Sequence, residues 1–475
     1  MIRGALAPLE RGPQATATEA SEPPRNLRRV ITARRYSGFA LARGTGYAAS
    51  AMRVLALSLS MLVGCGDSLS EPPPVASLPA PTVAAAVAPP PKHAEVRPHH
   101  EEAVVECPVA SADGDDDTRV AALLEAANKQ ISEANFNAAW TCADRAADLM
   151  PTSVEAHHLR GSALAALGRD REAQLAYGLA LALDPDDPET LRAVADFYIN
   201  GSKADAGDKI RDSIEHTRDA LRLGLELAQR GSRRVIARRR KSPQLAADLA
   251  VLEAQALNDL GRSEEALARV DVALRQSPGR GDAMHEKGVA LFDLSRFVEA
   301  RASLERAVAI QPEDAYSHQI LGLTLEALGD VDGGEKELAR ALRLAPTELS
   351  APVLISVKEF EKEIDTVIRS LAKERQARVR ATRIEIVDLP DPADLAAVKP
   401  PFPPTILGLY RGPVGKPHVV PSEGEAPSIV LYRKNLARAV KSRGELSEQI
   451  RDTLLHEIGH LEGLDEDDLR RRGME

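Results

Sequence analysis

The stretch GVALFDLSRFVEARASLERAVAIQP, from Gly288 to Pro312, decides the fold of this 475-residue chain. Gly288 lies near the middle of a first expected helix, Ala300 and Ala307 lie in a second, and Pro312 follows the second. Small residues let paired helices approach closely, and a proline stops a helix because it has no backbone N–H and its ring clashes with the preceding turn. The stretch therefore predicts one closely packed helix pair.

The same spacing returns with a period of 34 residues. Prolines stand 34 residues apart at Pro151 and Pro185, and again at Pro278, Pro312 and Pro346. Small residues recur at the same two distances before them: Ala139 and Ala146, Ala173 and Ala180, Ala266 and Ala273, Ala300 and Ala307, Gly334 and Ala341. Glycine recurs in the first helices as Gly161, Gly288 and Gly322. The pattern resembles the tetratricopeptide repeat family. The resemblance implies an α-solenoid that presents a concave face to peptides or protein partners.

One repeat breaks the period. Pro185 and Pro278 are 93 residues apart, which is not a multiple of 34, so we expect an insertion at about Asn200–Lys209. We count five regular repeats and an irregular sixth at about 188–245.

A second decisive stretch is HEIGHLEGLDE, from His456 to Glu466. Apolar residues at steps of three and four predict that it lies on a helix that begins near Ser442. His456 and His460 then lie one turn apart on one face, where two imidazoles can bind one metal ion. Glu457 lies beside that face, where a general base for a zinc-bound water is needed.

The third ligand is open at this point. Gly463 can take a left-handed conformation and turn the chain, so that an acidic residue completes the site. By spacing this residue is Glu466, but Asp465 and Asp467 flank it and either could take its place. A catalytic zinc site needs three protein ligands and one open position. Because the helix, Gly463 and the acidic cluster can supply these ligands, we expect zinc here rather than an ordinary amphipathic helix with surface histidines.

The segments before this helix extend the pattern. Residues 383–390 and 428–433 alternate like strands, and Leu407–Gly412 reads LGLYRG. Together with HExxHxxGxxE, this order resembles the small bacterial zincin-like metallopeptidase family over about residues 355–475. The resemblance implies a small α+β zincin-like domain.

Carried over residue by residue, the resemblance makes His456, His460 and Glu466 the zinc ligands and Glu457 the catalytic base. Two departures stand out. The family usually has aspartate where this chain has Glu466, and histidine or an aromatic residue where it has Leu461-Glu462. Tyr410 and Tyr432 are candidate donors to a developing oxyanion, with a core aromatic as the alternative for each. We also expect the strand at 428–433 to be exposed and able to bind an extended peptide by strand addition.

The N-terminal region predicts the location of the protein. Arg53, an apolar run at 54–63 and Gly64 before Cys65 resemble a bacterial lipoprotein signal, with Cys65 as the lipidated residue and Met52 as an alternative start. We therefore expect a protein of the bacterial cell envelope, lipid-anchored and facing the periplasm. Of the other cysteines, Cys107 and Cys142 could form a disulfide in an oxidising compartment, but we favour Cys142 as a small buried residue.

Composition sets the remaining bounds. A formal charge of −10 and an aromatic content of 3% argue against nucleic acid as a partner. The expected organisation is 1–64 N-terminal extension and signal, 65–114 Pro/Ala-rich tether, 115–350 repeat solenoid, and 351–475 zincin-like domain. The preferred function is zinc-dependent peptide-bond hydrolysis through a zinc-activated water, with the repeats recruiting substrate or partner. The alternative is a non-catalytic repeat scaffold of envelope complexes with an inactive or structural zincin module.

Overall fold

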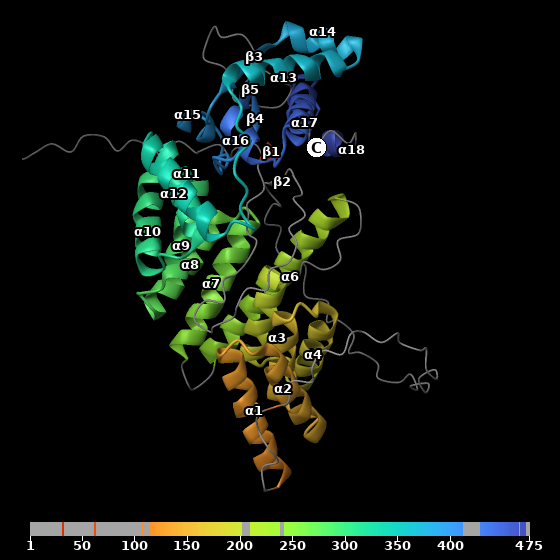
Figure 1. Cartoon of the computed structure of the whole chain (residues 1–475), viewed down its shortest axis with the longest axis vertical. Helices are drawn as coiled ribbons and strands as arrows, with labels where there is room; N and C mark the ends of the chain where they lie inside the picture. The colour runs from red at the N-terminus through yellow and green to blue at the C-terminus, as the bar shows by residue number, and fades with distance from the viewer. Residues whose placement is uncertain are drawn as a thin grey trace, which may run out of the picture.

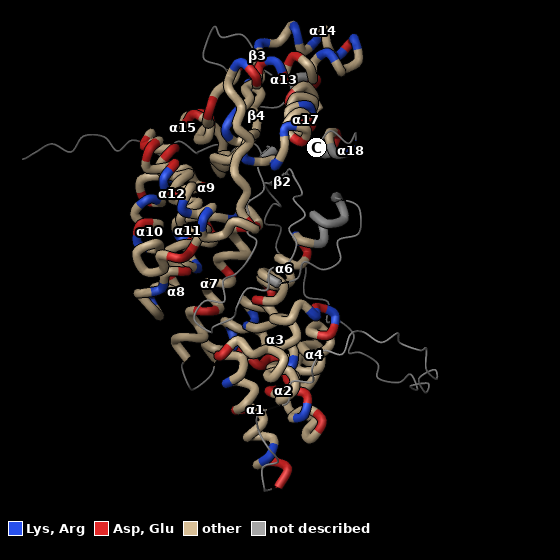
Figure 2. The backbone as a smooth tube through the Cα atoms, viewed as in Figure 1, with Lys and Arg blue, Asp and Glu red and all other residues tan. Residues whose placement is uncertain are grey.

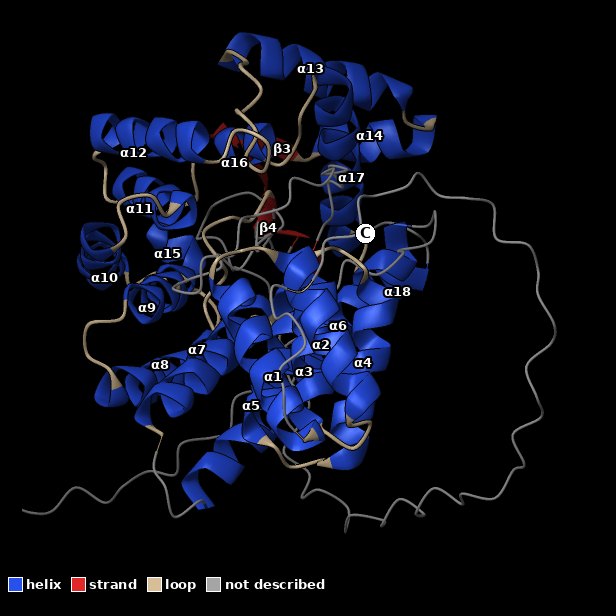
Figure 3. Cartoon of the chain, turned by 60° about the horizontal axis from the view of Figure 1, so that its bottom comes forward, coloured by secondary structure: helices blue, strands red, loops and turns tan. Residues whose placement is uncertain are grey.

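The computed structural model describes residues 31–32, 61–62, 107, 115–201, 210–237, 242–411, 428–464 and 466–471. Helices dominate these residues, and the few strands are short (Figures 1 and 3). A helical repeat array is followed by a small α+β region with a three-stranded sheet. This architecture confirms the predicted fold class.

The array contains six helix pairs in the described part of the chain. They are α1 (Asp116–Ser132) with α2 (Phe136–Leu149), α3 (Val154–Ala166) with α4 (Asp170–Leu183), α5 (Pro188–Asp196) with α6 (Ile210–Ala237), α7 (Pro243–Asp259) with α8 (Ser263–Gln276), α9 (Gly281–Asp293) with α10 (Phe297–Ile310), and α11 (Ala315–Ala327) with α12 (Val331–Leu344). In every pair but the third, one of the five prolines of the repeat pattern lies two residues beyond the second helix.

The small residues lie where the two helices of a pair meet. The alanines of the repeat pattern are at most 1% exposed. A Cβ added to Gly161 would lie 2.6 Å from the ring of Tyr177 in α4, and one added to Gly288 would clash with Leu304 in α10. A larger side chain at these positions would force the paired helices apart, as the sequence predicts.

In five repeats, the turn between the two helices of a pair contains a residue in the left-handed backbone conformation. The φ angle is 60° at Ala134, 70° at Gly168, 76° at Gly261, 57° at Ser295 and 86° at Gly329. Glycine takes this conformation without steric penalty, whereas Ala134 and Ser295 carry a Cβ there at a cost.

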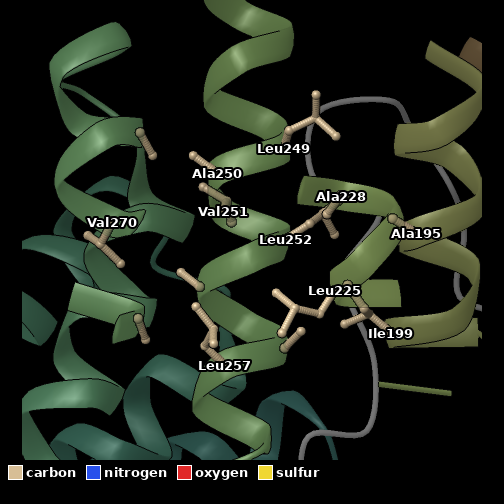
Figure 4. Packing of buried hydrophobic residues seen from close by; sticks show 14 of the residues in the cluster. Ala195, Ile199, Leu225, Ala228, Leu249, Ala250, Val251, Leu252, Leu257 and Val270 are labelled. Atoms are coloured by element: carbon tan, nitrogen blue, oxygen red, sulfur yellow. The ribbon is translucent and has the colours of Figure 1, made fainter. Parts of the chain in front are cut away.

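The third pair contains the predicted irregularity. Its first helix, α5, continues into a π-helical segment at Phe197–Gly201, and α6 has 28 residues where α2, α4, α8, α10 and α12 have 14. Residues 202–209, within the expected insertion, lie outside the described residues. Leu225 and Ala228 of α6 share one apolar cluster with α7, so the enlarged pair still stacks on the next (Figure 4).

A disulfide closes the start of the array. Cys107 is bonded to Cys142 of α2, and both are buried in the apolar cluster of the first repeats. Cys142 is therefore buried, as we favoured, but our preference against its pairing with Cys107 is wrong. The bond joins residues 35 positions apart in the sequence, and a helical spacing pattern does not report such a pairing.

Farther toward the N-terminus, Ile31–Thr32 (β1) pairs antiparallel with Met61–Leu62 (β2), and only β2 lies inside the expected signal stretch. Cys65 lies outside the described residues. Among the helices that are described, none has both the length and the apolar character needed to cross a bilayer.

The C-terminal region surrounds a mixed sheet. Its elements are α13 (Val357–Ser370), α14 (Lys373–Ala381), β3 (Arg383–Val387), α15 (Pro392–Leu395), β4 (Gly408–Arg411), β5 (Ser428–Tyr432), α16 (Arg433–Arg438), α17 (Arg443–Leu461) and α18 (Glu466–Arg471). The strand order is β3-β5-β4, with β3 parallel and β4 antiparallel to β5. β5 is thus the central strand and all five of its residues are buried. The expectation that 428–433 is an exposed strand available for strand addition is wrong.

The two faces of this sheet have different covers. Ile429 and Leu431 point into a core formed with α13 and α17. Val430 and Tyr432 alternate to the other face, where they share a core with α9, α10 and α11 of the last two repeats. The repeat array therefore supplies part of the core of the C-terminal domain.

An ion-pair cluster reinforces this junction. Glu326 of α11, whose side chain is 2% exposed, accepts hydrogen bonds from Lys434 Nζ at 2.9 Å and Arg438 Nη2 at 2.5 Å, both on α16. In the same helix, Asn435 Nδ2 donates to the carbonyl oxygens of Pro404 and Ile406 at 2.9 and 2.8 Å. α16 therefore joins the last repeat to the loop that leads into β4.

Candidate metal centre

The motif lies at the C-terminal end of α17, as the helical spacing predicts. The apolar face of α17 is 0% exposed at Leu446, Ile450, Leu454 and Ile458. Ser442 caps the helix by accepting the N–H of Glu445 at 3.2 Å. The Glu445 carboxylate accepts a hydrogen bond from the N–H of Lys441. In a reciprocal capping box it would accept from the next residue, Ser442. At the other end, Gly463 has a φ of 83°, which is the left-handed turn expected there.

The two histidines of the motif converge. His456 is 0% exposed and His460 is 5% exposed, and their Nε2 atoms lie 3.0 Å apart. The two rings are nearly perpendicular, at 87°, so they meet edge to face rather than stacking. One helical turn on a single face has therefore brought two imidazole nitrogens to a common point.

A backbone carbonyl sets the tautomer of His460. The oxygen of Leu464 lies 3.2 Å from His460 Nδ1. A carbonyl oxygen can only accept, so Nδ1 carries the proton and Nε2 of the neutral ring presents its lone pair. This is the arrangement in which histidine binds metal ions, and the turn at Gly463 brings Leu464 into place for it.

Glu457 is 3% exposed, and its charge acts on Tyr432, the last residue of the central strand. Its charge contributes to the raised pKa of Tyr432, whose larger causes are burial and the carboxylate of Asp394. The Tyr432 hydroxyl donates a long hydrogen bond, 3.4 Å, to Asp394, which is also bound by Arg411. The tyrosine therefore keeps its proton and points toward Asp394.

Tyr410 lies on the opposite face of the sheet. It is 1% exposed within the core formed with α17, and burial raises its pKa. Both candidate oxyanion donors are thus buried aromatics, and an oxyanion role for either stays a prediction.

The LGLY stretch allows α17 to lie close to the sheet. A Cβ added to Gly408 of β4 would lie 2.6 Å from Cγ2 of Thr453, which is three residues before His456. Glycine at 408 therefore permits the approach of the motif helix. The LGLY pattern in the sequence contains this glycine but does not show why glycine is needed at this position.

The structure describes only part of the acidic residues that are candidates for the third ligand. The backbone of Glu466 begins α18, but its side chain, the Asp467 side chain and all of Asp465 lie outside what is described. Among described residues, no three or more potential ligands gather at one point. The choice among Asp465, Glu466 and Asp467 stays a prediction.

A residue that the motif did not single out explains one family departure. Glu462, which follows Leu461, accepts a hydrogen bond from Arg378 Nη1 of α14 at 2.5 Å. Its side chain is 17% exposed and engaged with another helix. The position thus serves contact between α14 and the end of α17.

The residues present fit a zinc ion. Two nitrogen ligands at about 2.0–2.1 Å from a tetrahedral zinc ion lie roughly 3.4 Å apart, close to the separation of the two Nε2 atoms. The carbonyl that holds Nδ1 of His460 supplies the supporting contact usual for such ligands.

Comparison with protein families agrees with this geometry. Residues 379–474 match the model for zincin-like metallopeptidase. Residues 251–315, 285–348 and 154–187 match models for the tetratricopeptide repeat. The chain therefore contains tetratricopeptide repeats and a C-terminal zincin-like metallopeptidase domain.

Solved structures resemble the repeat region only loosely. One solved structure comes from a functional characterisation of Pseudomonas aeruginosa pilF. It has 15% identity and a TM-score of 0.39, and the alignment covers 53% of this chain and 99% of the other. A thermophilic TPR protein of Thermus thermophilus has 18% identity, covers 44% and 99%, and has a TM-score of 0.35. YrrB, a TPR protein described with an unusual peptide-binding site, has 15% identity, covers 43% and 92%, and has a TM-score of 0.29. Likeness at this level carries no argument about function. No curated protein matches the sequence.

Proposed function

We propose that the C-terminal domain is a zinc-dependent peptidase that hydrolyses peptide bonds. The observation that carries the proposal is the pair of buried Nε2 atoms 3.0 Å apart, one of them held as a lone-pair donor by Leu464. His456, His460 and one acidic residue, by spacing Glu466, would hold the metal. When bound, zinc would polarise the scissile carbonyl and lower the pKa of a water molecule.

Glu457 would act as the general base and acid. It follows His456 directly, and its burial makes its charge act strongly on nearby groups. It would accept a proton from the attacking water and return it to the leaving amine. Asp394 and Arg411 would hold Tyr432 beside it in the protonated form.

An extended substrate would bind along an edge strand of the sheet rather than along β5. The β3-β5-β4 order leaves both β3 and β4 at edges of the described sheet, and β3 is the more exposed of the two. Edge strands can bind a peptide by main-chain hydrogen bonds, whereas a central strand has both sides paired.

The repeats would recruit the substrate or a partner. Stacked repeats generally bind peptides or proteins on their concave face. Because the last two repeats already contact the C-terminal domain, we assign recruitment to the earlier repeats.

We also propose that the protein is anchored to a bacterial envelope membrane through a lipid on Cys65 and faces the periplasm. The Cys107–Cys142 disulfide supports an oxidising compartment, since such bonds persist mainly outside the cytosol. Mass spectrometry of the mature N-terminus tests this directly. An unmodified Cys65 within an uncleaved chain would overturn it.

Zinc content tests the proposed site first. We expect about one zinc per chain in the purified protein and in Glu457→Gln, and almost none in His460→Ala. His318→Ala in the repeats is the matched control and should keep its zinc. Single alanine variants of Asp465, Glu466 and Asp467 identify the third ligand as the one whose loss releases metal.

Catalysis is tested separately. The zinc-loaded Glu457→Gln variant should lose hydrolysis by a factor of at least about 10² while still binding substrate, and so serve as a substrate trap. No zinc in any reconstituted form would favour the non-catalytic scaffold instead.

A further inference from the structure

Helix α14, which precedes β3 along the chain, is unusually basic. The segment 369–383 contains six basic residues and one acidic residue, in a chain with a net charge of −10. The α14 basic cluster, defined as Lys373, Arg375, Arg378 and Arg380, gives the helix its positive charge (Figure 2).

This helix does not owe its composition to packing. Val379 is its only buried residue in the structure. A helix that is polar on nearly all sides gains little from burial, so its surface needs another explanation. Lys373 and Arg380 are exposed, and neither forms an ion pair within the described chain.

The cluster adjoins the candidate metal centre. Arg378 holds Glu462, which lies two residues after His460 and caps the end of α17. Positive charge at Lys373 and Arg380 therefore lies on a helix fastened to the end of the motif helix. A ligand bound by these two side chains would therefore lie on the helix that contacts the end of α17.

We propose that the α14 basic cluster binds acidic polypeptide segments and gives the peptidase a preference for substrates with Asp or Glu near the cleaved bond. This inference rests on the proposed function for its second half only. Complementary charge favours acidic segments and disfavours basic ones, and it also accelerates encounter. The two exposed basic side chains, Lys373 and Arg380, supply the attraction, while Arg378 keeps the helix in place.

Two other anionic partners fit less well. A membrane-binding helix carries large apolar side chains to insert into the lipid, and the exposed residues of α14 include only alanine as apolar members. A nucleic-acid surface usually combines basic residues with aromatic ones, and α14 has no aromatic residue.

Binding to a labelled peptide tests the first half. The probe is a fluorescent ten-residue peptide rich in Glu, compared with one rich in Lys, measured by anisotropy at low and high salt with the full-length Glu457→Gln protein. We expect the Glu-rich peptide to bind and the Lys-rich peptide not to bind. The affinity for the Glu-rich peptide should fall in high salt. The double variant Lys373→Glu/Arg380→Glu should weaken binding by about tenfold or more.

The matched control is Lys358→Glu/Lys362→Glu on α13, which changes the net charge equally and uses two exposed lysines. It should leave binding nearly unchanged. Equal losses in both double variants, or no preference for the acidic peptide, would overturn the proposal. Binding of anionic vesicles or duplex DNA in place of the peptide would also overturn it.

Cleavage-site profiling on a peptide library tests the second half. Wild-type protein should enrich Asp and Glu near the cleaved bond, and the α14 double variant should lose that enrichment while still cleaving. Absence of all cleavage would count against the proposed peptidase and leave the binding experiment to decide the α14 cluster. Cleavage without acidic enrichment would refute the specificity alone.

Discussion

At the scale of single residues, the left-handed turn is the most repeated feature of the array. Its five positions follow the spacing of the prolines, yet only three are glycine. The sequence pattern did not predict this turn, because Ala134 and Ser295 conceal a backbone requirement that glycine would have revealed.

Ser295→Gly should stabilise the fifth repeat. It removes a Cβ from a φ of 57° and also the Ser295 hydroxyl, which is buried without a hydrogen-bond partner. After the greater chain entropy of glycine, the net gain should be about 1 kcal/mol. Hydrogen exchange of α9 and α10 amides measures it, and Gly261→Ser in the preceding repeat should show the opposite sign.

Gly408 is predicted to affect the candidate metal centre through the space that it leaves for α17. Gly408→Ala should lower stability by about 1–3 kcal/mol and weaken zinc retention, because the new methyl group meets Thr453 Cγ2. Thr453→Ser removes that γ-methyl and should restore part of the loss when the two changes are combined. Calorimetry and metal analysis of both single variants and the double variant give the answer, and a double variant no better than Gly408→Ala would contradict this explanation.

At the scale of elements, helices were more predictable than the sheet. Period and spacing predicted the repeat pairs, the motif helix and the strands around 383–387 and 428–432. They did not predict that β5 is central, because strand order depends on pairing between segments far apart in sequence. The disulfide was missed for the same reason.

Helix α13 has a pH-sensitive cap. Hydrogen bonds from Ser356, with a further contribution from Arg443 of α17, lower the pKa of Glu359 to about 2. A lowered pKa contributes stability that is full above the ordinary value near 4.5 and is lost as pH falls through about 2. Denaturant unfolding of Glu359→Gln and wild type should therefore differ at about pH 6 and converge toward about pH 2, with Glu361→Gln as the exposed control on the same helix. A difference independent of pH would contradict the assignment.

At the scale of the whole molecule, the C-terminal zincin-like domain and the last repeats share a core. The motif residues were predictable from a short local pattern, whereas the contact of Val430 and Tyr432 with α9–α11 has no local signature. It arises because consecutive residues of β5 face opposite sides of the sheet.

Substitutions at two neighbouring residues of β5 should affect the two cores independently. Val430→Ala should reduce hydrogen-exchange protection in α9, α10 and α11, because Val430 is 0% exposed in the core shared with the repeats. Ile429→Ala should instead affect α13 and α17. Each change should cost about 2 kcal/mol or more. Identical exchange patterns in the two variants would show that the cores do not act separately.

The shared core also limits how this chain can be divided. A fragment that begins after the last repeat would leave Leu409, Val430 and Tyr432 uncovered, and a fragment that ends there would uncover Leu321 and Leu325. Both cut faces are apolar enough to drive aggregation. The smallest portable unit that contains the zincin-like domain would therefore begin near Gly281, and gene rearrangements that transplant this domain would have to carry two repeats with it.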